Sequence, residues 1–168
     1  SGALHPDAGS MELDGRPFAP RSTEDARHAG VAMIYQELSL APHLSVEDNV
    51  MLGMEPVRWG VRHLQEIRTR TLAALEQLGH GSLDPTVRVG TLPIATRQIV
   101  EIARALAVGC RVLVLDEPTS SLTLADIERL FKVISSLRDR GHAIVYISHF
   151  LEEVKRIADS FTVLRDGR

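Results

Sequence analysis

Several features that would assign the chain to a special class are missing from the sequence. Cys110 is the only cysteine, so no disulfide can form within the chain, which suits a reducing compartment. Neither an apolar run of about 18 residues nor a charged-then-apolar leader is present, so we expect any membrane association to come through a partner. A net charge of −3, without a Lys/Arg cluster, argues against direct binding of DNA or RNA.

The remaining composition is that of one compact domain. Of the 168 residues, 44% are hydrophobic and 24% are charged, which is ordinary for a globular protein. A chain of this length buries roughly 70% of its unfolded surface. Strand-like and helix-like stretches alternate along it, and this alternation predicts a layered α/β fold.

The candidate chemistry centres on a stretch in which an apolar run ends in two carboxylates. Residues 112–115 are all branched and apolar, and Asp116, Glu117 and the turn residue Pro118 follow them. This pattern favours a parallel strand covered on both faces, and such sheets place ligands beyond the carboxyl ends of their strands. One carboxylate there can hold a Mg²⁺ shell while its neighbour orients a water. The alternative is a strand end with two solvated acids.

Two further apolar stretches end in polar side chains. Residues 31–36 end in Gln36, and residues 143–149 end in His149. In a parallel sheet the carboxyl ends of the strands lie at one edge. We therefore expect the three polar ends to meet, within reach of a phosphate, a metal ion or a water.

Together these residues resemble the ATPase domain of an ATP-binding-cassette (ABC) transporter, over essentially the whole chain. The resemblance makes Gln36 the glutamine loop, Asp116 the Walker B acid, Glu117 the catalytic glutamate, residues 120–123 the D-loop and His149 the switch histidine. More narrowly, the chain is similar to the first of the two tandem cassettes of bacterial monosaccharide importers. The stretches that carry this narrower similarity are 35–39, 100–106 and 118–123.

The resemblance implies ATP and Mg²⁺ as ligands. Glu117 would polarise the attacking water, and Asp116 and Gln36 would approach Mg²⁺ through its waters. His149 would donate to the γ-phosphate and hold Glu117 in place. Ser120 and Ser121 of the D-loop complete this set of candidate site residues.

The family's phosphate-binding loop, G-x-x-x-x-G-K-[ST], does not occur in the sequence. In the family it comes directly before the segment that residues 1–4 resemble. We therefore expect an N-terminally truncated, P-loop NTPase-like core that is inactive alone and has either a changed packing or an exposed apolar sheet edge. A family member that naturally lacks the loop is the alternative.

The resemblance also divides the chain into three parts, namely a partial core at 1–40, a helical subdomain at 41–109 and the rest of the core at 110–168. Within the subdomain, apolar periodicity predicts helices over 63–78 and 96–107. The sequence places three polar residues of the second helix away from its apolar side: Arg97, Glu101 and Arg104. The resemblance puts the docking surface for a permease near 40–52, where ordinary core is the competing interpretation.

The signature motif of the family, Leu-Ser-Gly-Gly-Gln, departs from its pattern here. Its positions are occupied by Leu92, Pro93, Ile94, Ala95 and Thr96. Pro93 offers neither a hydroxyl nor an N–H, and Ala95 resists the positive φ that glycine adopts freely. Two lost donors would cost about 1 to 3 kcal/mol each in a dry site. We expect two unequal ATP sites, unless nearby residues restore the contacts.

Other elements follow from local signals. Thr123 and Asp126 resemble a capping pair at the start of a helix, and a short helix over 151–157 is expected to carry Glu152, Glu153, Lys155 and Arg156 on its wet side. The remaining predicted elements are a strand and turn at 10–17, a helix at 22–27, and a strand at 161–164 with its turn at 166–167.

The sequence therefore favours a nucleotide-binding subunit that couples ATP hydrolysis to sugar import. Its expected partners are a transmembrane sugar permease, a second cassette and, indirectly, a periplasmic or extracellular sugar-binding protein, with no nucleic acid. Its expected place is the cytoplasmic face of the membrane, as a peripheral protein. The alternatives are a hydrolysis-deficient docking module and a soluble ABC protein that acts on ribosomes or DNA.

We predict that this chain alone does not bind Mg-ATP, whereas a version extended at its N-terminus to include the phosphate-binding loop does. The reason is that the loop supplies most of the contacts to the phosphates. Isothermal calorimetry of the two proteins side by side checks this. Comparable binding by the shorter chain would contradict it.

Overall fold

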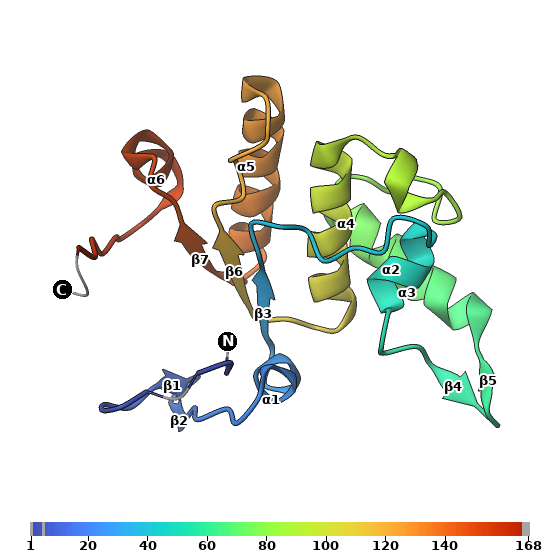
Figure 1. Cartoon of the computed structure of the whole chain (residues 1–168), viewed down its shortest axis with the longest axis horizontal. Coiled ribbons are helices and arrows are strands. Elements are labelled where there is room, and N and C mark those ends of the chain that lie inside the picture. The colour runs from blue at the N-terminus through green and yellow to red at the C-terminus, as the bar shows by residue number, and fades with distance from the viewer. Residues whose placement is uncertain (1, 5, 166–168) are drawn as a thin grey trace.

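The protein is described by a computed structural model, which covers residues 2–4 and 6–165. A three-stranded sheet in the order β3-β6-β7 lies at its centre, and helices flank it, so the predicted α/β fold is confirmed (Figure 1). The strands are β1 (Glu12–Leu13), β2 (Arg16–Pro17), β3 (Val31–Ile34), β4 (Val57–Arg58), β5 (Val61–Arg62), β6 (Val112–Asp116) and β7 (Ala143–Ile147). The helices are α1 (Thr23–His28), α2 (Val46–Met51), α3 (Leu64–Gln77), α4 (Ile94–Ala107), α5 (Leu124–Asp139) and α6 (Leu151–Ile157), with a 3-10 turn at Val89–Thr91.

The central sheet is parallel throughout, as the apolar runs predict. β6 pairs with β3 on one side and with β7 on the other, and Leu115 stands opposite both Ile34 and Tyr146. Leu113 and Leu115 are fully buried on the face that α5 covers. The ring of Phe131 from α5 meets Tyr146 edge-on at 6.3 Å, which fixes the helix on that face.

The opposite face of the sheet is less covered, so the prediction that residues 112–115 are covered on both faces is wrong. Burial alternates along β6, and on β7 the side chains of Val145 and Ile147 are 47% and 43% exposed. The reason is that α5 packs against only one face. β7 ends the strand order of the described sheet, so its outer edge has no neighbouring strand among the described residues.

Local capping signals place the helix ends. Ser22 caps α1 by accepting from Asp25 N, and Gly30, at φ 87°, follows its end. Thr123 accepts from Asp126 N at the start of α5, so the predicted capping pair is confirmed. By contrast α4 begins at Ile94, two residues before the predicted start.

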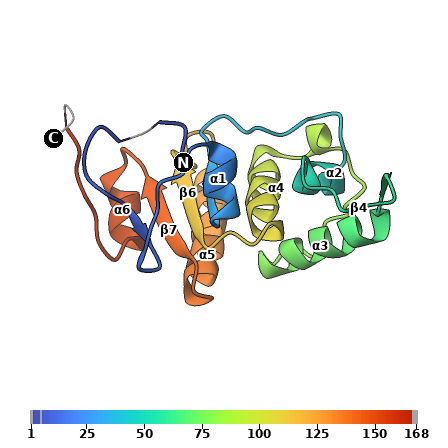
Figure 2. The same cartoon turned by 90° about the horizontal axis from the view of Figure 1, so that it is seen from below.

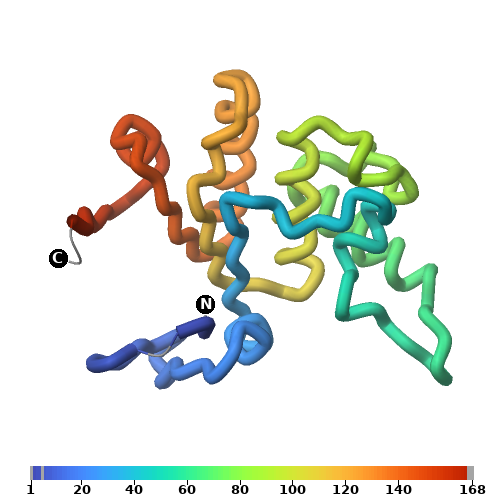
Figure 3. Tube along the Cα trace, in the orientation of Figure 1, coloured from blue at the N-terminus to red at the C-terminus, as the bar shows by residue number. Residues whose placement is uncertain are grey.

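Helices α2, α3 and α4 pack against one another as a separate helical layer. Figure 2 shows this layer at one end of the molecule and α6 at the other. The chain leaves β3, runs across α4 and enters α2 (Figure 3). The fully buried apolar residues of the layer are Val46, Val50, Met51, Ile67, Leu75, Val89, Val100, Ile102 and Ala103.

The terminal segments agree only in part with the prediction. The hairpin of β1 and β2 is confirmed, and its turn has positive φ at both Asp14 and Gly15 (52° and 70°), as a type I′ hairpin turn has. The strand predicted at 161–164 is wrong, because these residues are irregular and have no neighbouring strand among the described residues. Its turn at 166–167 lies outside the described residues. In the part of the chain that the structure covers, no helix is long and apolar enough to cross a membrane.

We predict that Asn49→Ala lowers the free energy of unfolding by about 3 kcal/mol. Asn49 is fully buried, and its amide contacts the backbone on both sides of the turn before α2, accepting from Ala41 N at 2.7 Å and donating to Ser45 O at 2.9 Å. Urea unfolding measures the change. Gln65→Ala, the matched control on the exposed side of α3, is expected to stay within about 0.5 kcal/mol. Equal effects of the two substitutions would contradict the prediction.

Candidate functional site

The backbone at the end of β6 sets the direction of Glu117. Asp116, the last residue of β6, stands opposite Ile147. Glu117 then adopts φ 45°, a left-handed conformation that costs an ordinary residue roughly 1 to 2 kcal/mol. Its N–H donates to Ile147 O at 2.9 Å, so the ladder between β6 and β7 holds the turn.

Both carboxylate oxygens of Glu117 are engaged by residues from the neighbouring strand ends. Gln36 Nε2 donates to Oε2 at 3.2 Å, and His149 Nδ1 lies 3.0 Å from Oε1. The expectation that the three strand ends meet is thereby confirmed. The side chains of Glu117 and His149 are 32% and 60% exposed, so the cluster is open to solvent and to a ligand.

A cavity of about 360 Å³ adjoins this cluster. Its lining includes Gln36, Glu117, Ser120 and Ser121, and also Ile94 from the first turn of α4. The structure thus brings five of the predicted site residues to one cavity. The lining does not include the other six, Leu92, Pro93, Ala95, Thr96, Asp116 and His149.

The signature segment forms the start of α4. Pro93 is the N-cap residue and makes no side-chain capping hydrogen bond, in line with its missing hydroxyl. The argument from positive φ at Ala95 is wrong, because Ala95 lies in the first helical turn and glycine's freedom is not needed there. Arg97 donates to Leu92 O at 2.9 Å and to Gly90 O at 2.8 Å, which holds the segment in place.

Two polar residues of α4 were not predicted to belong to the site. Gln98 is buried and donates to Pro118 O at 2.8 Å, directly after Glu117. Glu101 is only 8% exposed and accepts from Ser39 N at 2.6 Å, so its predicted place away from the apolar side is wrong. Their spacing was the available signal, since each lies four residues before a buried apolar residue of α4.

Burial of the Glu101 carboxylate is electrostatically unfavourable, and Arg104 and the Ser39 N–H reduce this unfavourable free energy. Burial raises the pKa of its carboxyl, while Arg104 and the Ser39 N–H act in the opposite direction. The ionised form is therefore less stable in the folded protein than in water. The contact with Ser39 nevertheless ties α4 to the loop that carries Gln36.

Glu153 also departs from its predicted place. It was expected on the wet side of the short C-terminal helix, but it is half-buried and accepts hydrogen bonds from three hydroxyl groups. Ile157, one turn further on, packs against the core, so the spacing already placed Glu153 on the inner side of α6.

The donor atoms at the strand ends suit a hard cation. Among the described residues there is no group of three or more His, Cys, Asp or Glu side chains arranged to hold a metal. Asp116 supplies carboxylate oxygens, and Gln36 donates to Glu117 through its nitrogen and so keeps its amide oxygen free. Few oxygen ligands, with waters completing the shell, are what Mg²⁺ prefers.

The parallel sheet, the polar residues at its carboxyl edge and the helical layer beside it are arranged as in solved ATP-binding cassettes. A nucleotide-free ATP-binding cassette from an ABC transporter matches it with a TM-score of 0.79 at 20% identity, covering 94% of this chain and 66% of that one. CbiO1 from Clostridium perfringens, part of the ABC transporter complex cbiONQ, matches with a TM-score of 0.76 at 24% identity, covering 94% of this chain and 62% of that one.

Sequence comparison identifies the family. Residues 1–120 match the model of the ABC transporter family, and the chain belongs to that family. It is 50% identical to the ribose import ATP-binding protein RbsA of Chromobacterium violaceum, covering 99% of this chain and 33% of that protein. It is 44% identical to the arabinose import ATP-binding protein AraG of Rhizobium etli, covering 100% of this chain and 33% of that protein. The chain thus spans about a third of the length of the curated relatives it matches.

We predict that Glu101→Gln stays within about 1 kcal/mol of the parent protein at pH 7, whereas Glu101→Ala loses about 2 kcal/mol because it leaves Ser39 N unpaired. Because the folded-state pKa of Glu101 is raised, the folded state binds the proton more tightly than the unfolded state. The parent protein should therefore gain stability relative to Glu101→Gln as the pH falls through that raised pKa toward 4.5. Urea unfolding of the three proteins across pH measures this, and a difference that does not change with pH would contradict it.

Proposed function

We propose that this chain forms part of the nucleotide-binding ATPase of a sugar ABC importer. The supporting observation is the carboxylate of Glu117, held through both oxygens by Gln36 and His149 at the carboxyl edge of the sheet. Membership of the ABC transporter family and the similarity to ribose and arabinose import proteins support the same proposal.

In the proposed reaction, Glu117 orients the attacking water and accepts its proton as the water attacks the γ-phosphorus of ATP. Gln36 and His149 keep the carboxylate in one orientation, which lowers the entropic cost of aligning the water. His149 is exposed enough to turn a ring nitrogen toward the γ-phosphate as well.

The proposed contacts to the nucleotide and to Mg²⁺ also lie at the carboxyl edge of the sheet or next to it. Asp116 and the free amide oxygen of Gln36 would hold Mg²⁺, which, when bound, neutralises charge on the phosphates. Ser120 and Ser121 line the adjoining cavity and are the proposed D-loop contacts. The segment 92–96, at the start of α4, is proposed to face ATP bound to a second cassette through its free backbone N–H groups.

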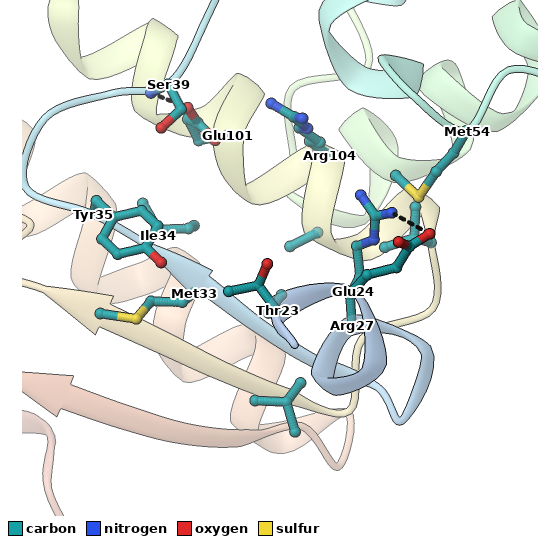
Figure 4. Close-up of a pocket in the computed structure, with 14 residues that line it drawn as sticks. Thr23, Glu24, Arg27, Met33, Ile34, Tyr35, Ser39, Met54, Glu101 and Arg104 are labelled. Atoms are coloured by element: carbon teal, nitrogen blue, oxygen red, sulfur yellow. Dashed lines mark hydrogen bonds and ion pairs between the residues drawn. The ribbon is translucent and has the colours of Figure 1, made fainter. Parts of the chain in front are cut away.

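We place the docking surface for a transmembrane permease at a groove between α1, β3 and α4, with a volume of about 380 Å³ (Figure 4). Figure 4 shows Glu24 and Arg27 of α1 on one side and Glu101 and Arg104 of α4 on another. Met54 closes the end near the helical layer. The groove adjoins the segment 40–52 named from the sequence, in which Val46, Val50 and Met51 are core residues and Leu40, Leu44 and Leu52 are partly exposed.

In the proposed importer, a permease bound at the groove would be connected to the candidate site through hydrogen-bonded residues. Ser39, in its lining, is tied to Glu101 of α4 and lies three residues beyond Gln36. The proposed division into a core at 1–40 and 110–168 and a helical subdomain at 41–109 puts this contact at their boundary. The chain would then act at the cytoplasmic face of the membrane through its permease, with a sugar-binding protein acting indirectly.

A docking module that does not hydrolyse ATP is the second candidate. The observation in its favour is Pro93, which begins α4 without the side-chain hydroxyl of the family's signature. In this case the edge residues would position ATP without cleaving it.

We predict that Glu117→Gln in the full-length protein lowers the kcat for ATP hydrolysis by about 100-fold or more, because the amide cannot accept the proton of the water. The KM for ATP should stay within about threefold, since the substitution leaves the phosphate contacts in place. A coupled assay of ADP release by the protein reconstituted with its permease measures both constants.

The matched control is Glu76→Gln, the same substitution at an exposed position of α3. It should leave both constants unchanged. Hydrolysis at the parent rate by Glu117→Gln would rule out the hydrolytic role of this cassette and favour the docking module.

A further inference from the structure

Among the acids that the structure describes, Glu153 accepts the most side-chain hydrogen bonds, and it lies outside the cluster of Gln36, Glu117 and His149. It lies in the first turns of α6, and a single oxygen, Oε2, accepts three hydrogen bonds. The donors are Tyr146 Oη at 2.7 Å, Thr119 Oγ1 at 3.0 Å and Ser148 Oγ at 3.0 Å. An ionised carboxylate only accepts and has about four lone-pair sites on its two oxygens, so it needs no donor of its own here; hydrogen bonds to an ionised acceptor are stronger than those between neutral groups.

The donors come from the two loops that carry the proposed catalytic residues. Thr119 is buried and lies two residues beyond Glu117. Ser148 immediately precedes His149, and its hydroxyl also accepts from Phe150 N at 3.0 Å. One carboxylate therefore fixes the chain close to Glu117 and on both sides of His149.

The remaining donor is the Tyr146 phenol. Burial and the hydrogen bond to Glu153 raise its pKa above the ordinary value for tyrosine, so Tyr146 stays a donor. Tyr146 belongs to β7 and also meets the ring of Phe131 of α5. Glu153 is thus tied to the sheet itself as well as to the two loops.

The helix that carries Glu153 has its own anchor on α5. Arg156 forms a bidentate pair with Glu128, with bonds of 2.7 and 2.8 Å, and its guanidinium lies 5.0 Å from the ring centre of Phe131. The pair is exposed and contributes little free energy by itself, but it fixes the position of α6. Because α6 is held on α5, the hydrogen bonds of Glu153 can restrict the positions of the two loops.

We propose that Glu153 is a positioning residue that holds the loops of Glu117 and His149 in the arrangement needed for hydrolysis. This inference rests on the proposed function. Glu153 forms no hydrogen bond with Glu117 or His149 themselves. It would align both residues through the loops that carry them.

The test compares Glu153→Ala with Glu152→Ala in the full-length protein reconstituted with its permease. Glu152, the neighbouring exposed acid of α6, is the matched control. For Glu153→Ala we expect kcat to fall about 10- to 100-fold and the KM for ATP to stay within about threefold, because alignment is lost while nucleotide contacts remain. Glu153→Gln retains an acceptor oxygen and should recover kcat to within about fivefold of the parent.

Hydrogen exchange measured by mass spectrometry supplies a readout that does not depend on activity. Glu153→Ala should speed exchange in the separate segments 117–121 and 147–150, and Glu152→Ala in neither. A kcat within about twofold of the parent, or faster exchange confined to α6, would overturn the inference. If Glu153→Ala does not fold, the pair Tyr146→Phe and Ser148→Ala removes two of the three donors, and an unchanged kcat in that double variant overturns it equally.

The two proposals fail in different ways. No ATP hydrolysis by the parent protein, or full activity of Glu117→Gln, would overturn the proposed function and the catalytic consequence of this inference. The exchange measurement would still decide whether Glu153 ties the two loops together.

Discussion

The parallel pairing of β6 with β3 and with β7 is the constraint on which the candidate site depends. Parallel strands all end at one edge, so residues that are 81 and 32 positions apart in the sequence meet at Glu117. The left-handed backbone of Glu117 is tolerated because its N–H continues the ladder to β7. Without that pairing, Gln36 and His149 would have no common partner.

The helix α4 joins this edge to the helical layer. Gln98 reaches the backbone beyond Glu117, and Glu101 reaches the loop beyond Gln36, each from a largely buried position. Burying such groups is unfavourable unless their hydrogen bonds are made, and here each has a backbone partner. A displacement of α4 would therefore move both loops together.

Local signals were enough for most elements. The apolar runs identified all three strands of the central sheet, and the capping pair of Thr123 and Asp126 identified the start of α5. The predictions that were wrong share a different origin. They concern the cover on both faces of β6, the strand at 161–164 and the solvent exposure of Glu101 and Glu153. Each of these depends on which residues pack beside the segment, and a local sequence pattern does not contain that information.

By itself the sequence determined the three strands of the central sheet, the polar residues at the strand ends and the departure of residues 92–96 from the family's signature. These are properties of consecutive residues, since periodicity, capping and turn chemistry act over a few positions. Only the tertiary structure decided that Glu117 is held through both oxygens and that Glu153 gathers three hydroxyls. Such contacts join elements that are distant in the chain, so their geometry exists only once the sheet and the helices have packed.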